Sequence, residues 1–215
     1  MTVDSQPLVS DAGRAALLAV LHDLAAAKHL LGYRCSLWTA RAPGLETKMA
    51  LAGMDLEEEG HAKVLEGFAT DALGGPAFDR QTPVSWNRWP AISDADARTV
   101  REETWPAALA RHAALDAACT RLLERLATST LPGLAQRAAK MVHEERFHSL
   151  FARDALATID HASERLAAEH DDAAAQARGL NEATAPALAT LVAAGLLPAD
   201  GAQPADGAQP DRARH

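Results

Sequence analysis

The sequence is poor in the residues on which several classes of protein depend. It has two cysteines, Cys35 and Cys119, which are too few for a disulfide framework. Aromatic residues make up only 4% of the 215 residues. β-Branched residues are sparse among abundant alanine and leucine, and this composition favours helix almost throughout. We therefore expect an all-α protein with reduced cysteines.

The sequence lacks three further features, and each absence argues against a class of partner or location. No run of basic residues offsets the formal net charge of −8, so nucleic acid is not an expected partner. No apolar run approaches the roughly 18 residues of a membrane span, so no membrane contact is expected. The first ten residues lack the basic-then-apolar pattern of a secretion signal, which predicts a cytoplasmic protein.

Apolar residues recur at alternating spacings of three and four, as in the helices of a bundle. Proline and glycine separate the periodic segments, which predict four long helices at about 11–40, 45–73, 96–128 and 134–159. Two further helices are expected at about 161–177 and 182–195. We expect residues 11–197 to form one domain between a disordered N-terminus (1–10) and a disordered, repetitive tail (198–215).

The motif Glu-x-x-His occurs twice, as Glu58/His61 and as Glu145/His148. Both pairs fall on the apolar seam of their helix, and residues three apart share one helix face. Two such helices facing each other, with a carboxylate from each of two more, form the di-iron or di-manganese site of a ferritin-like four-helix bundle. Asp116 lies on the seam of the third helix, so Glu58, His61, Asp116, Glu145 and His148 are the predicted metal ligands.

The fourth carboxylate is replaced by a lysine. Asp116 precedes Glu145 by 29 residues, and the residue 30 before Glu58 is Lys28. Lys28 could pair with Glu58 or Glu145 and weaken one metal position. Alternatively, it could swing away while His29, Asp23 or water fills the gap, or the protein could bind one metal or none around a buried ion network.

The remaining polar residues near the motifs are not assigned as metal ligands. His112, one turn from Asp116, is interpreted as a core histidine more readily than as a ligand. Glu57, Glu59 and Glu144 are interpreted as solvated, although Glu144 could also reach His148, four residues on.

Several short segments carry a resemblance to a known family. They are Leu31-Gly32-Tyr33-Arg34-Cys35-Ser36-Leu37-Trp38, Ala42-Pro43-Gly44-Leu45-Glu46, Met49-Ala50-Leu51-Ala52, Leu115-Asp116-Ala117 and Glu144-Glu145-Arg146-Phe147-His148. In this order, over about residues 15–160, the chain resembles the phenylacetic acid catabolic proteins, which are ferritin-like subunits of the bacterial phenylacetyl-CoA epoxidase. That family contains a catalytic di-iron subunit and a structural partner subunit that has lost most ligands.

The resemblance implies an oxygenase that activates O2 at a di-iron centre and hydroxylates or epoxidises an organic substrate. Its cofactor would be iron, with one metal or manganese as alternatives. It would work with an electron-donor protein and a related ferritin-like subunit or a second copy. The local sequence looks more like the partner subunit, although Glu58 and His61 stand where that subunit is expected to lack ligands. Two alternatives follow, a non-catalytic partner subunit and a metal or oxidant handler of the ferritin or rubrerythrin type.

Overall fold

The computed structural model describes residues 9–75, 104–159 and 164–199, and for residues 164–173 it describes the backbone alone. Within these ranges the chain is helical and contains no strand. The helices are α1 (Asp11–Thr39), α2 (Leu45–Gly67), α4 (Trp105–Ala127), α5 (Pro132–Ala157) and α6 (Glu164–Ala193), and a short π-helix, η1 (Phe68–Ala72), continues α2.

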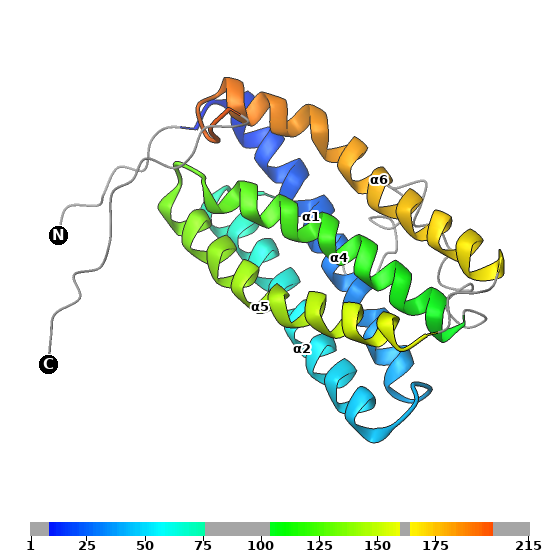
Figure 1. Ribbon diagram of the computed structural model, residues 1–215. Helices are drawn as coiled ribbons and strands as arrows, with labels where there is room; N and C mark the ends of the chain where they lie inside the picture. Colours follow the sequence, from blue (N-terminus) through cyan, green and yellow to red (C-terminus); the bar gives the residue numbers. More distant parts are fainter. Residues whose placement is uncertain (1–8, 76–103, 160–163, 200–215) are drawn as a thin grey trace, which may run out of the picture.

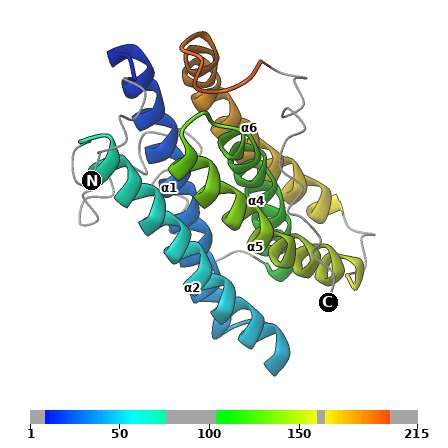
Figure 2. The ribbon, with the colours of Figure 1, turned by 90° about the vertical axis from the view of Figure 1, so that its left-hand side faces the viewer.

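Four of these helices form the bundle, and the fifth covers one side of it. α1 packs along α2, and α4 packs along α5, so the two pairs face each other (Figure 1). α6 lies along α1 and α4, away from α2 and α5 (Figures 1 and 2). The expected ferritin-like four-helix bundle with an added C-terminal helix is therefore confirmed.

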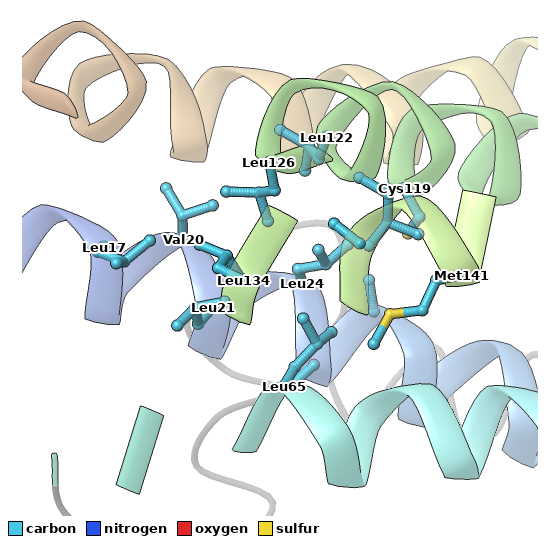
Figure 3. Packing of buried hydrophobic residues seen from close by; sticks show 14 of the residues in the cluster. Leu17, Val20, Leu21, Leu24, Leu65, Cys119, Leu122, Leu126, Leu134 and Met141 are labelled. Atoms are coloured by element: carbon cyan, nitrogen blue, oxygen red, sulfur yellow. The ribbon is translucent and has the colours of Figure 1, made fainter. Parts of the chain in front are cut away.

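The predicted seams form the core. Leucines of α1, α2 and α4 pack together in the centre, among them Leu24, Leu65 and Leu126 (Figure 3). Met141 of α5 and Cys119 of α4 belong to the same cluster, and both cysteines are free thiols, as expected. The core is aliphatic because the sequence has so few aromatic residues to place there.

α1 is the most apolar helix of the described chain. It alone among the described helices reaches the length and mean hydropathy of a membrane-crossing helix, although 72% of its apolar window is buried within the bundle. This burial is that of a core helix, because α1 contacts α2, α4 and α6 at once.

Two helix boundaries differ from the prediction. The third long helix was expected from about residue 96, but α4 begins at Trp105. Thr104 is extended, and its hydroxyl accepts a hydrogen bond from the Ala107 amide, so Thr104 caps the helix. Pro106 fits the first turn because its missing N–H would have no partner there.

The second difference concerns the C-terminal helices. The two helices expected at 161–177 and 182–195 are one helix, α6, which continues through Gly179 and contains Pro186. Leu180 and Thr184 are buried on the near side of α6, so packing outweighs the weak helix propensity of this stretch. The predicted disordered ends and the connection around residues 76–103 lie largely outside the described residues.

A core truncation tests this packing. Leu126→Ala should lower the free energy of unfolding by about 2–5 kcal/mol, because Leu126 is fully buried and its loss leaves a cavity. Arg153→Ala, whose side chain is 70% exposed, should change it by less than about 0.5 kcal/mol. Urea denaturation followed by circular dichroism measures both, and equal effects would show that the core is placed wrongly.

Candidate metal centre and buried ion network

The structure brings all the predicted site residues into one buried layer. α2 supplies Glu58 and His61, α4 supplies Asp116, and α5 supplies Glu145 and His148. Each of these five residues is at most 5% exposed. The layer lies across the middle of the bundle because each residue takes a seam position of its helix.

Lys28 of α1 occupies the centre of the layer. Its side chain is completely buried, and its Nζ lies 3.0 Å from Glu58 Oε2 and 2.8 Å from Glu145 Oε2. Asp116 Oδ1 lies 3.6 Å from the same nitrogen. Burial alone would lower the pKa of Lys28, but the surrounding carboxylates raise it well above its ordinary value. The ammonium therefore stays charged and binds three carboxylates from three other helices.

The two histidines connect α2 and α5 reciprocally. His61 of α2 contacts Glu145 Oε1 through Nδ1 at 2.8 Å and Glu144 Oε2 through Nε2 at 2.9 Å. His148 of α5 contacts Glu58 Oε1 through Nδ1 at 3.0 Å and Glu57 Oε2 through Nε2 at 2.8 Å. Each histidine thus binds the Glu-Glu doublet of the opposite helix.

These contacts determine the charge of both rings. A neutral imidazole has one N–H donor, whereas an ionised carboxylate can only accept. A ring with a carboxylate on each nitrogen satisfies both contacts only when it is protonated. Burial opposes the charge, but the adjacent carboxylates of Asp116, Glu145 and Glu58 raise the pKa of His148 to about 12. Burial likewise opposes the charge of His61, and its carboxylate partners raise its pKa.

Asp116 is the least strongly held carboxylate of the layer. Its Oδ2 accepts a hydrogen bond from the Ser149 hydroxyl at 3.3 Å. Burial and the adjacent Glu145 raise the pKa of Asp116 to about 7. The pKa of Glu145 falls well below its ordinary value: burial acts against this shift, but Lys28 and the neighbouring Asp116, His148 and His61 outweigh it. Glu145 therefore carries the negative charge at neutral pH more firmly than Asp116 does.

His112 stands at the edge of the layer. Its Nδ1 lies 3.7 Å from Cys35 Sγ, and its ring centroid lies 6.3 Å from that of His148. Burial and the adjacent His148 lower the pKa of His112 to about 3, so this ring is neutral. A cavity of about 10 Å³, lined mainly by Trp38, Trp105 and other apolar side chains, reaches His112. That space holds about one water molecule and is too small for an organic substrate.

The donor set of the layer could hold a metal ion. Two groups of residues are arranged so that, within each group, the possible ligand atoms lie within 4.8 Å of one another. Glu58 belongs to both groups. The first group adds His112, Asp116 and His148, and the second adds His61 and Glu145. Carboxylates and imidazoles suit first-row metals. The role of these residues as metal ligands stays a prediction.

A pair of metal ions does not fit this layer as it stands. The Lys28 ammonium contacts the carboxylates of Glu58, Glu145 and Asp116, which two metals would need to share. A metal also requires an unprotonated imidazole nitrogen, whereas both nitrogens of His61 and of His148 face carboxylates. A metal would have to displace protons and the ammonium together.

The structure thus distinguishes between the hypotheses for the position of the Lys28 side chain. The lysine does not swing away, and it pairs with Glu58 and Glu145 together. His29 does not enter the layer, because its ring bridges Glu59 and Glu66 at 2.9 and 2.7 Å.

Sequence reasoning missed two residues of the network. Glu57 and Glu144 were expected in solvent, and their side chains are indeed 50% and 31% exposed, but the expectation missed that they contact the outer nitrogens of His148 and His61. Glu144 does not use its i+4 neighbour His148; it contacts the opposite helix. The signal was the doublet itself, because Glu-Glu-x-x-His occurs in both motifs.

Removal of the buried cation tests the network. Lys28→Met should lower the free energy of unfolding by about 3–5 kcal/mol, because it leaves buried carboxylates uncompensated. Glu145→Gln in the Lys28→Met background should recover part of that loss.

The matched control is Lys140→Met, a lysine of α5 that is 78% exposed and should change stability by less than about 0.5 kcal/mol. Urea denaturation in the presence of a chelator measures all four proteins. A Lys28→Met variant as stable as the control would contradict the charge network.

Comparison with known proteins agrees with the fold and the motifs. A search of curated proteins finds no match. A protein-family model described as phenylacetic acid catabolic protein matches residues 1–178, which include α1, α2, α4, α5 and every residue of the polar layer. The chain belongs to the phenylacetic acid catabolic protein family.

Proposed function

We propose that this chain is a ferritin-like subunit that works beside a catalytic relative and holds no metal pair of its own. The observation that carries the proposal is the position of Lys28 Nζ, within 3.0 Å of carboxylate oxygens from both α2 and α5. In this role the ammonium replaces the positive charge that a metal supplies in a di-iron bundle.

The charge balance of the layer supports this role. Three buried carboxylates, Glu58, Asp116 and Glu145, face the Lys28 ammonium and two imidazolium rings. Unpaired buried charge is costly, and these three cations offset the charge of the buried carboxylates without a metal. Two divalent ions added to such a layer would bring an excess of positive charge.

The surroundings of the layer support the same role. An oxygenase needs space beside its metals for an organic substrate, and ligand pockets usually measure about 300–1,000 Å³. Among the described residues, the cavity that reaches His112 is about 10 Å³. A role in assembly needs no such space, and a cytoplasmic location, as the sequence predicts, suits it.

A second candidate is an oxygenase with a depleted iron site. Two ligand groups that share Glu58 favour it, because their donor atoms lie close enough to bind one ion. Bound iron would supply O2 activation, and Glu58, His61, Asp116, Glu145 and His148 would hold it, with His112 beside them. Such a site would require Lys28 to leave the carboxylates. The electron donor and organic substrate would then be those that the family resemblance implies.

Iron loading separates the two candidates. Wild-type protein incubated with Fe(II) under argon and desalted should retain far less than one iron per chain, because Lys28 and the protonated rings compete for the ligands. Lys28→Glu supplies the missing carboxylate and should retain about two irons, while Lys140→Glu should behave as wild type. Elemental analysis gives the iron content and circular dichroism verifies the fold. Two irons in wild type, with an O2-dependent optical change, would favour the oxygenase.

A further inference from the structure

A thiol and an imidazole meet beside the polar layer. Cys35 of α1 and His112 of α4 lie on the buried seams of their helices, and each residue is at most 5% exposed. Cys35 follows Lys28 by two helical turns, and His112 precedes Asp116 by about one turn. The Cys35 Sγ lies 3.7 Å from His112 Nδ1. The two seams therefore bring together two side chains of the kinds that bind transition metals.

This contact uses little of the bonding capacity of either atom. A thiol is a weak hydrogen-bond donor, and a thiol that donates to Nδ1 leaves the ring proton on Nε2. That tautomer keeps a lone pair on Nδ1. A metal ion needs an unprotonated nitrogen, and burial together with the adjacent His148 lowers the pKa of His112 to about 3, so the ring is neutral. An ion can thus replace the thiol proton without any change in the imidazole.

The space at this contact suits a single small ion. Bonds of about 2.3 Å from a metal to sulfur and about 2.0 Å to nitrogen together exceed the 3.7 Å between the two atoms, so an ion beside the line that joins them reaches both. Cys35 and His112 themselves line the cavity of about 10 Å³. Trp105 and Phe151 line it too and are only partly buried, so the way in from solvent lies between α4 and α5.

The charge of this place favours a monovalent ion. Burial raises the pKa of Cys35 well above its ordinary value, and Glu58 adds to the effect, so the free thiol is neutral. A monovalent ion that displaces the thiol proton leaves the local charge unchanged, because one positive charge leaves and one enters. A divalent ion would add a net buried charge beside the Arg34 side chain, which also lines the cavity. Structural zinc, in addition, takes four ligands.

We propose that Cys35 and His112 form a binding site for the cuprous ion, Cu(I), with one thiolate and one imidazole ligand. Thiolate selects Cu(I) among the first-row metals, and imidazole also suits copper. On binding, the Cys35 S–H bond breaks, bonds form from copper to Sγ and to His112 Nδ1, and the proton passes to solvent. Copper stays as Cu(I), so the step needs no oxidant or reductant. The inference does not depend on whether the carboxylates of the polar layer hold iron.

Titration with Cu(I) under argon tests the site. Wild-type protein that competes with the chromophoric chelator bicinchoninate should take up about one Cu(I) per chain. Cys35→Ser nearly keeps the shape of the side chain but removes the sulfur, and this uptake should be lost. His112→Gln should weaken binding by more than about tenfold, since even the supporting partners of a metal ligand are worth that much. Circular dichroism verifies that both variants fold.

The matched control is Cys119→Ser. Cys119 is the other buried cysteine, and it lies in the aliphatic cluster with Leu24 and Leu126 (Figure 3). This variant should take up Cu(I) as the wild type does. X-ray absorption of the copper-loaded wild type tests the ligands without any substitution, and it should show one sulfur and one imidazole nitrogen bound to copper.

Three results would overturn the proposal. The first is a wild type that leaves all Cu(I) with the chelator. The second is a Cys35→Ser variant that takes up as much Cu(I) as the wild type. The third is an equal loss of Cu(I) in Cys119→Ser, which would show that buried thiols bind the ion without regard to the imidazole.

Discussion

The structure depends on one buried ion cluster. In it the Lys28 ammonium contacts the carboxylates of Glu58, Glu145 and Asp116. A completely buried charge is tolerated only where opposite charges compensate it. Because the carboxylates come from three helices, the ammonium joins α1 to α2, α4 and α5 at one depth. The same carboxylates are predicted metal ligands, so in the proposed function the interaction that stabilises the layer also limits metal binding.

The contacts of the two histidines are the second set of interactions that hold the layer together. His61 and His148 each contact a Glu-Glu doublet on the opposite helix, which links α2 to α5. The aliphatic core above the layer excludes water, and exclusion of water strengthens each ion pair. The layer therefore fixes the position of α2 relative to α5.

Much of the fold and of the polar layer could be predicted from the sequence. Seam positions of the helices were predictable because burial follows helical periodicity, and Lys28 was placed among the motifs by its distance from Glu58. The partners of Glu57 and Glu144 were not predictable, because the contacts depend on the offset between two helices that are distant in sequence. Nor could periodicity predict that α6 continues through Gly179 and Pro186, since packing of Leu180 and Thr184 decides it.

The protonation of His148 tests the account most directly. Nuclear magnetic resonance of protein with ¹⁵N-labelled histidine, kept metal-free with a chelator, reports whether each ring nitrogen carries a proton. An ordinary histidine has a pKa of about 6.5, whereas the carboxylates around His148 raise its pKa to about 12. At about pH 8.5, between these values, the account predicts protons on both nitrogens of His148, with exposed His143 on the same helix as a reference signal. A bare nitrogen on His148 at that pH would contradict a self-balanced ion network and leave a ligand free for a metal.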